Sequence, residues 1–206
     1  MSYNCTVIDV QPEKVIIDMS TTPKRRAVCS YENMSDELAA AFAEKYPENK
    51  NELYTLLAEQ LTALTDGEPH AIPNLANCSA LLFYALKDIN WAGFYLTKTN
   101  ETTGKEYLLL GPFQGKTACI RIPVGKGVCG TAVAEDATQL VPDVHAFPGH
   151  IACDSASESE IVIPLRKNGE IYGVLDIDSP MYHRFTEEDR LGLEAFARAL
   201  ETVLNG

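Results

Sequence analysis

The hydrophobic period of the sequence changes once, near Asp88, and this change limits the chain to folds that combine helices with a sheet. Before it, segment 48–66 has leucines at the 3.6-residue spacing of one helix face: Leu53, Leu56, Leu57, Leu61 and Leu64. Segments 36–46 and 74–86 predict two further helices, the first ending before a proline. After the change, short apolar runs alternate with turn residues, which predicts strands.

These strands predict an α+β fold. Segments 90–98 and 106–113 form a hairpin, 118–124 is a third strand and 138–144 is another. Segment 125–136 is expected to be a glycine-containing loop that enters a short helix. The chain closes with a helix over 185–206, where Thr186 can cap the N-terminus and acids occupy the first turn.

Length and composition indicate one domain. The 206 residues are 46% apolar, enough for one sizeable core. Residues 1–34 show no long periodic pattern, so we expect an N-terminal extension that is partly ordered at best, followed by a single domain over 35–206. Cys78, in the predicted helix over 74–86, is expected to be a buried apolar residue.

The charge balance excludes several classes of partner. Twenty-nine acidic residues oppose 17 basic ones, giving a net charge of −12, so nucleic acids and anionic membranes are not expected partners. No apolar run approaches the roughly 20 residues that span a bilayer, and the N-terminus lacks the features of a signal peptide. A cytoplasmic protein is expected, in which the six cysteines are free, metal-bound or catalytic.

The turn at Asn168 and Gly169 allows two registers for the last hairpin. A two-residue loop would place Ile161 across from Asp176, mixing apolar with acidic side chains. A three-residue loop over 167–169, with Gly169 left-handed, instead gathers the apolar residues on one face: Ile161, Ile163, Leu165, Ile171, Leu175 and Ile177. We therefore expect the three-residue loop.

That register places three acids on the opposite face. Glu160 would lie across from Asp176, with Asp178 two residues farther along. Like charges this close repel by a few tenths to about 1 kcal/mol each, so the group requires a cation or a proton. The alternative is a solvated acidic face.

Three cysteines precede these acids in the sequence: Cys119, Cys129 and Cys153. An attacking thiol, a second thiol that closes a disulfide, and acids that hold an ammonium group or supply a proton are the components of a sulfoxide reductase. The pattern therefore indicates redox chemistry on a cationic small molecule.

Four segments carry a resemblance to a known family: NWAGFYL, LGPFQGKTACIRIPVGKGVCGTAV, DVHAFPGHIACDSASESEIVIPL and NGEIYGVLDIDSP. They resemble the free methionine-(R)-sulfoxide reductases, which are single GAF-domain enzymes. The resemblance implies a central, mostly antiparallel sheet of about six strands flanked by helices, and a homodimer. It also implies reduction of free methionine (R)-sulfoxide, no cofactor, and recycling by a thioredoxin-type dithiol protein.

The resemblance also assigns roles to the cysteines. Cys153 matches the attacking cysteine of the family, Cys119 its usual resolving cysteine, and Cys129 a third thiol that is an alternative resolver. Which of Cys119 and Cys129 dominates stays open.

The remaining implied positions concern the substrate. Glu160, Asp176 and Asp178 match the substrate carboxylates, and Trp91 and Tyr95 match aromatic residues of the pocket. Asp143 matches an acid beside the site, although Pro142 stands where relatives often have a second acid.

Two other functions remain to be weighed. GAF domains often bind ligands or transmit signals without catalysis, so a small-molecule or redox sensor is the alternative. A zinc site from Cys119, Cys129, Cys153 and a histidine is disfavoured, because the gaps of 9 and 23 residues lack the short Cys-x2-Cys hooks of structural zinc. No metal is therefore expected.

Overall fold

The computed structural model describes residues 46–151 and 155–205. The expected extension over 1–34, the expected helix over 36–46 (apart from Tyr46) and Cys153 lie outside these residues. Among the described residues, no helix combines the length and apolarity needed to cross a membrane.

A six-stranded sheet forms the centre of the described part, with strand order β3-β2-β1-β6-β5-β4. All of the described neighbours pair antiparallel. The strands are β1 (Trp91–Thr99), β2 (Glu106–Gly115), β3 (Arg121–Pro123), β4 (Gln139–Val141), β5 (Ser159–Lys167) and β6 (Glu170–Ser179). The expected α+β fold with a six-stranded antiparallel sheet is confirmed, including the β1–β2 hairpin.

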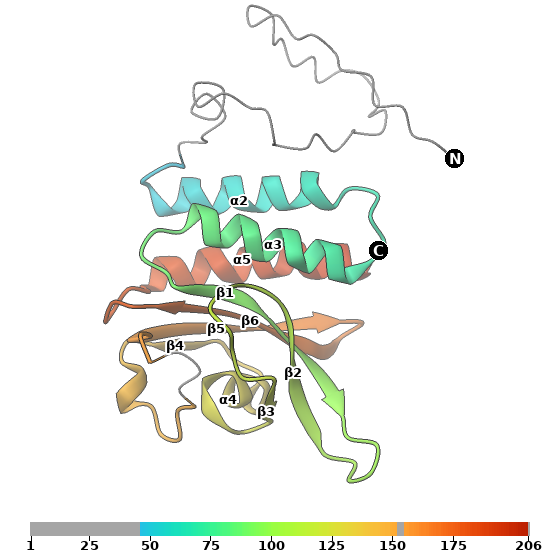
Figure 1. Ribbon diagram of the computed structural model, residues 1–206. Coiled ribbons are helices and arrows are strands. Elements are labelled where there is room, and N and C mark those ends of the chain that lie inside the picture. The colour runs from blue at the N-terminus through green and yellow to red at the C-terminus, as the bar shows by residue number, and fades with distance from the viewer. Residues whose placement is uncertain (1–45, 152–154, 206) are drawn as a thin grey trace, which may run out of the picture. The chain divides into compact units, whose positions relative to one another are not determined.

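Helices cover both faces of the sheet unequally (Figure 1). Three long helices lie on one side: α2 (Lys50–Thr65), α3 (Ala71–Ala85) and α5 (Glu187–Asn205). The short helix α4 (Gly127–Glu135) lies on the other side, with the 3-10 turn η2 (Val144–Ala146) in the segment between β4 and β5.

Each face has its own core. The helix-side core packs the three long helices against alternate residues of the central strands, among them Leu57, Leu61, Leu82, Phe94, Ile161, Ile163, Leu175, Ile177 and Phe196. The pocket-side core packs α4 against the other face and includes Trp91, Tyr95, Leu108, Ile122, Val128, Cys129, Val162 and Val174. The alternation along β1 divides its side chains between the two cores.

Helix α2 differs slightly from the expected leucine stripe. Asn49 caps it, its side chain accepting a hydrogen bond from the Glu52 N–H at 3.1 Å. The buried stripe is Tyr54, Leu57, Leu61 and Thr65, spaced by three, four and four residues. The expectation that Leu64 belongs to it was wrong: this side chain is 46% exposed, because the stripe passes through Leu61 and Thr65 instead. Cys78 is buried, as predicted.

The expected three-residue loop of the last hairpin was also wrong. Lys167 pairs with Glu170, so the loop has two residues, and both Asn168 (φ 55°) and Gly169 (φ 83°) are left-handed. This is the backbone of a type I′ turn, which Asn-Gly favours. The positive φ predicted for Gly169 is confirmed.

A bulge next to the turn returns the side chains beyond it to their expected faces of the hairpin. Arg166 pairs with Ile171 but Leu165 pairs with Gly173, so Tyr172 is an extra residue in β6. Beyond the bulge the register differs from the expected one by two residues, which leaves every side chain on its expected face. Ile171 lies on the turn side of the bulge and packs against the pocket-side core, contrary to expectation.

Candidate functional site

A pocket opens on the face of the sheet that carries α4. It is lined by strands β1, β5 and β6, by the start of α4, and by the segments before β3 and before β5. The lining residues are Trp91, Tyr95, Thr117, Ala118, Ile122, Gly127, Val128, Cys129, His150, Ile151, Ser157, Glu160, Asp176 and Asp178.

The corrected register brings three acids together in this pocket. Glu160 of β5 lies across from Asp178 of β6, and Asp176 lies across from Val162, so all three share the pocket face. The expected pairing of Glu160 with Asp176 is therefore wrong, although the three acids converge as predicted. Glu160 and Asp176 are each only 5% exposed.

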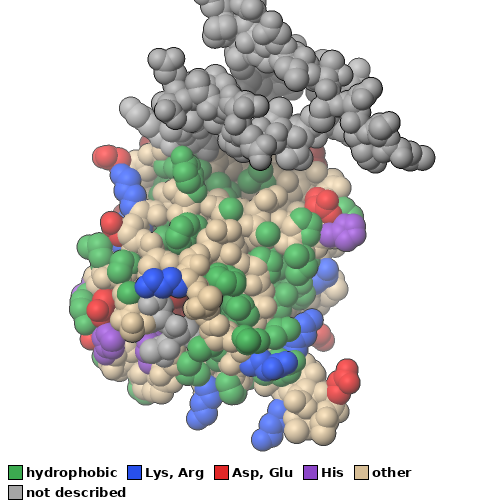
Figure 2. Space-filling model, viewed as in Figure 1, with side chains coloured by type: hydrophobic (Ala, Val, Ile, Leu, Met, Phe, Trp, Pro, Cys, Tyr) green, Lys and Arg blue, Asp and Glu red, His purple; other side chains and the backbone are tan. Residues whose placement is uncertain are grey.

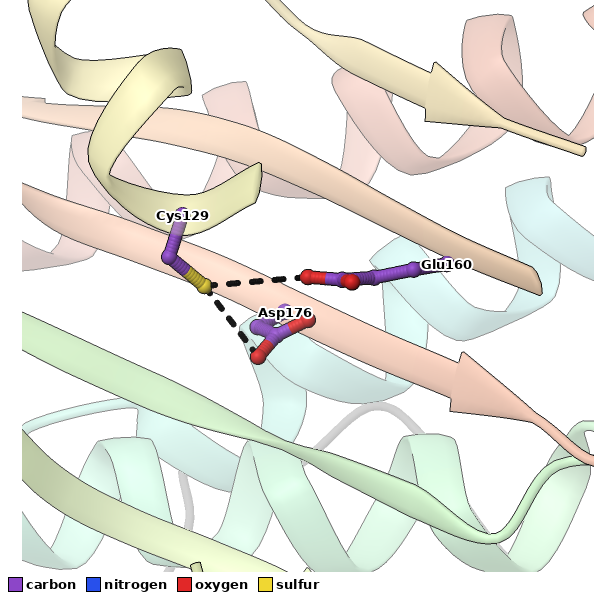
Figure 3. Close-up of side chains that lie close together, drawn as sticks. All are labelled: Cys129, Glu160 and Asp176. Carbon is purple, nitrogen blue, oxygen red and sulfur yellow. Dashed lines mark hydrogen bonds between the residues drawn. The ribbon is translucent and has the colours of Figure 1, made fainter. Parts of the chain in front are cut away.

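Helix α4 points Cys129 at these carboxylates (Figure 3). The thiol donates hydrogen bonds to Asp176 Oδ2, with Sγ at 3.2 Å, and to Glu160 Oε1, at 3.9 Å. A close backbone approach fixes the helix here, because a Cβ on Gly130 would lie 2.4 Å from the carbonyl oxygen of Pro123. Any side chain at residue 130 would displace α4 and the Cys129 thiol with it.

The electrostatics of the cluster favour protonated groups. Burial, followed by the charges of Asp176 and Asp178, raises the pKa of Glu160 well above its usual value. Burial also raises the pKa of Asp176, while hydrogen bonds from Cys129 and Glu160 oppose that rise. Burial and the same carboxylates raise the pKa of the Cys129 thiol. Each of these shifts favours the protonated form of its group.

The described lining residues include no lysine or arginine beside Glu160 and Asp176. The one basic group among them is His150, whose Nε2 lies 3.8 Å from Glu160 Oε2. Burial, with a smaller effect from His145, lowers the pKa of His150 and favours its neutral form. On the face seen in Figure 2, exposed acids are interspersed with basic and apolar side chains.

Aromatic side chains lie beside the acids, because Trp91 of β1 pairs with Asp178 of β6. Trp91 stacks between Tyr95 and Phe113, with ring centroids 5.9 Å and 5.2 Å away. Trp91 Nε1 donates to the Lys116 carbonyl at 3.1 Å, and the Tyr95 hydroxyl donates to the Cys119 carbonyl at 3.0 Å. The two aromatics thus hold the segment that carries Cys119.

The structure separates the predicted site residues into three groups. Six line the pocket: Trp91, Tyr95, Cys129, Glu160, Asp176 and Asp178. Cys119 is half-buried and Asp143 caps η2 by accepting a hydrogen bond from the His145 N–H at 2.9 Å, and neither lines the pocket. Cys153 lies outside the described residues.

Sequence reasoning missed some contributors to the pocket. Phe113 is brought against Trp91 because it pairs with Gly93 across the β1–β2 ladder, where a Cβ on Gly93 would lie 2.3 Å from Phe113 Cβ. The glycine within an otherwise bulky strand was the available signal. Ser157 accepts a hydrogen bond from the Asn90 side chain at 3.1 Å, and no sequence signal pointed to it.

Comparison with known proteins agrees with this architecture. The GAF domain model matches residues 51–204. The free methionine-R-sulfoxide reductase of Escherichia coli is 56% identical over 156 residues, covering 76% of this chain and 91% of that protein. The yeast protein of the same name, from Saccharomyces cerevisiae, is 47% identical, covering 74% and 86%.

A solved structure supports the same relationship. The free methionine-R-sulfoxide reductase from Neisseria meningitidis, in complex with its substrate, superposes with a TM-score of 0.71 at 43% identity, covering 78% of this chain and 93% of that one. Fold and sequence identity agree over most of both chains, and the chain belongs to the GAF-domain family of free methionine-(R)-sulfoxide reductases.

Proposed function

We propose that this protein reduces free L-methionine (R)-sulfoxide to methionine. The observation that carries the proposal is a pocket in which the buried acids Glu160 and Asp176 have no lysine or arginine among the described lining residues and lie beside aromatic side chains. The chain is also closely similar to proteins of that name. A free amino acid supplies the missing cation with its ammonium group, and its methyl sulfoxide end suits the wall of Trp91.

The acids would divide two tasks between them. An ionised carboxylate attracts the ammonium group, while a protonated one supplies a proton to the sulfoxide oxygen. The raised pKa of Glu160 makes it our choice for the proton donor. Asp176 and Asp178, on the neighbouring strand, are then the partners of the ammonium group.

The proposed chemistry begins at Cys153, the position matching the attacking cysteine of the family. Its thiolate attacks the sulfoxide sulfur, and the sulfoxide oxygen, once protonated, passes to the cysteine as a sulfenic acid while methionine leaves. A second thiolate then displaces hydroxide from the sulfenic acid and closes a disulfide. A thioredoxin-type dithiol protein reduces the disulfide and is itself oxidised.

Cys119 is the better candidate for the second thiol. The Cys129 thiol is buried between two carboxylates that raise its pKa, so little of it ionises. Cys119 is half-buried, and its backbone is held beside the pocket by the Tyr95 hydroxyl. We propose Cys119 as the principal resolver and Cys129 as a residue that shapes the acid cluster.

The setting of this activity is also part of the proposal. Residues 35–206 would form the catalytic domain, which assembles as a homodimer, and residues 1–34 an extension. Dithiol recycling requires a reducing compartment, which the cytoplasm provides. The alternative, a ligand-binding GAF sensor, would bind the sulfoxide without turnover.

The decisive experiment measures methionine released from the purified reduced protein. With a dithiol reductant, free methionine (R)-sulfoxide should yield methionine, and the (S)-sulfoxide should not. N-acetyl-methionine sulfoxide should be a poor substrate because it lacks the ammonium group. Cys153→Ser is the control and should release none. Binding of the sulfoxide without release of methionine would favour the sensor and contradict the proposal.

A second measurement separates the two candidate resolving thiols. Cys119→Ser should release about one methionine per chain in a single turnover and then recycle poorly with thioredoxin. Cys129→Ser should keep recycling. Full recycling by Cys119→Ser together with failure of Cys129→Ser would reverse the assignment.

A further inference from the structure

Three ligating atoms converge at the base of the pocket. Cys129 Sγ and one carboxylate oxygen each from Glu160 and Asp176 all lie within 4.8 Å of one another, and all three residues are buried. They come from α4, β5 and β6, which are far apart in sequence, so the cluster is a product of the tertiary fold (Figure 3).

The spacing of these atoms fits a tetrahedral zinc ion. With bonds of about 2.3 Å to sulfur and about 2.1 Å to oxygen, tetrahedral zinc separates a sulfur and an oxygen ligand by about 3.6 Å. The sulfur lies 3.2 Å from Asp176 Oδ2 and 3.9 Å from Glu160 Oε1, on either side of that value. Small shifts of the side chains would equalise these distances.

A second, independent feature points to a missing cation. The other carboxylate oxygen of Asp176, Oδ1, is buried and has no hydrogen-bond partner among the described residues. Buried carboxylate oxygens are almost always partnered, and an unpartnered one requires an explanation. Asp176 also forms part of the pocket lining, so its carboxylate borders a space that an ion can enter.

The chemistry of the ligands favours zinc. A thiolate ligand selects zinc over magnesium or calcium, which prefer all-oxygen sites. His150 lies beside the cluster, with Nε2 3.8 Å from Glu160 Oε2, but it is not one of the three residues whose ligating atoms all lie within 4.8 Å of one another.

We propose that Cys129, Glu160 and Asp176 bind a single zinc ion. Binding releases the thiol proton of Cys129 and the carboxyl protons of the cluster to solvent, so the ion takes the place of bound protons. The site differs from the zinc set that the sequence suggested, because it uses neither Cys119 nor Cys153. Metal binding needs no turnover and is independent of the proposed function. Only its consequence, exclusion of an ammonium-bearing substrate and hence inhibition, rests on that function.

The test uses the full reduced chain, freed of metal, titrated with zinc against a chromophoric chelator. One tight site per chain is expected. Cys129→Ser and Asp176→Asn should each weaken zinc binding at least tenfold, whereas the matched thiol controls Cys119→Ser and Cys153→Ser should leave it unchanged. Magnesium should not compete. Zinc binding that survives Cys129→Ser, or that is lost in Cys153→Ser, would overturn the proposed site.

Cobalt provides a spectroscopic readout of the ligands. Cobalt in the reduced protein should give a sulfur-to-metal charge-transfer band that Cys129→Ser abolishes and Cys119→Ser preserves. Asp176→Asn keeps the thiol and should keep a weaker band, which guards against a Cys129 variant that fails to fold. A cobalt spectrum without sulfur ligation would contradict the proposal. None of these readouts measures activity. A protein that binds zinc through Cys129 but releases no methionine would therefore contradict the proposed function and leave the zinc site supported.

Discussion

Buried acids occur on both sides of the sheet, but among the described residues only the buried acid on the helix side has lysine and arginine partners. Asp189, at the start of α5, is 1% exposed and accepts hydrogen bonds from Lys50 at 2.6 Å, from the Tyr54 hydroxyl at 2.7 Å and from the Thr186 N–H at 2.8 Å. Arg184 adds a longer contact of 3.4 Å. Glu160 and Asp176 on the pocket side face a thiol and each other.

The difference appears in the direction of the pKa shifts. Burial alone would raise the pKa of Asp189, but the hydrogen bonds from Lys50, the Thr186 backbone and Tyr54, with the charge of Arg184, hold it below its usual value. In the pocket the same burial is unopposed by cations, and the pKa values of Glu160 and Asp176 rise. The helix side uses an acid to stabilise the fold, whereas the pocket keeps its acids available for a ligand.

The largest expected effect concerns Asp189. Asp189→Ala should lower the free energy of unfolding by about 3 kcal/mol, because it leaves the buried Tyr54 hydroxyl and the Lys50 and Arg184 charges without their partner. Urea denaturation measures the change. Glu188→Ala, an exposed acid on the same helix turn, is the matched control and should change stability by less than about 0.5 kcal/mol. Equal effects of the two substitutions would contradict a structural role for Asp189.

The corresponding change in the pocket should affect activity and leave stability intact. Glu160→Gln should lower kcat/KM for free methionine sulfoxide at least tenfold, about 1.4 kcal/mol, since it removes an acidic proton from the site. Its melting temperature should be unchanged or higher, because one of several crowded acids is neutralised. Glu170→Gln, an exposed acid at the other end of the same hairpin, is the control. A large loss of stability in Glu160→Gln would break the contrast between the two sides.

The two sides should also respond oppositely to pH. A carboxyl with a raised pKa stabilises the fold below its unfolded pKa, and this stability is lost as pH rises through the folded pKa. Asp176, with a pKa of about 6, should therefore make the protein less stable as pH rises from about 4 through about 6. Glu160, whose pKa is also raised, should add to this loss as pH rises through its folded pKa.

The variants of the preceding predictions separate these contributions. Glu160→Gln should flatten the loss of stability at rising pH, measured by urea denaturation at several pH values. Asp189, whose pKa is lowered, contributes stability that is lost as pH falls through its folded pKa, so Asp189→Ala should weaken the acid-induced loss. A Glu160→Gln profile parallel to the wild type would show that this carboxyl ionises normally.

The smallest expected effect concerns a tyrosine hydroxyl on the pocket side. Tyr95→Phe should cost about 1 kcal/mol of stability, because it removes one hydrogen bond between neutral groups, to the Cys119 carbonyl. Tyr54→Phe on the helix side should cost more, since its hydroxyl binds the charged Asp189. Tyr107→Phe, whose ring lies against Arg121 at the surface end of β2, should have no effect. A larger loss for Tyr95→Phe than for Tyr54→Phe would contradict this ranking.

Local patterns predicted most of the fold. Hydrophobic periodicity located α2, the β1–β2 hairpin and α5 because each depends on contacts within a short stretch of chain. The convergence of Glu160, Asp176 and Asp178 survived a wrong loop length, since the shorter loop and the bulge at Tyr172 each moved the pairing by one residue, two in total. A strand slip of one residue would have removed these acids from the pocket.

Contacts between distant segments were beyond such patterns. Cys129 lies 31 and 47 residues from the two carboxylates it contacts, and neither spacing is visible in the sequence. The sequence offered this residue only as an alternative resolving thiol, whereas its burial makes it a poor nucleophile. Asp143 was placed beside the site by resemblance, while the structure uses its carboxylate to cap η2.

The position of Cys129 affects how readily oxidants can modify its thiol. Peroxide oxidises thiolates, and the two carboxylates beside Cys129 suppress ionisation while burial excludes the oxidant. A protein that works on oxidised amino acids thus carries, at the base of its own pocket, a sulfur shielded from the same damage. Under rising peroxide, irreversible sulfonic acid should accumulate at the half-buried Cys119 before it reaches Cys129, and the acid cluster would keep its shape after Cys119 has been oxidised.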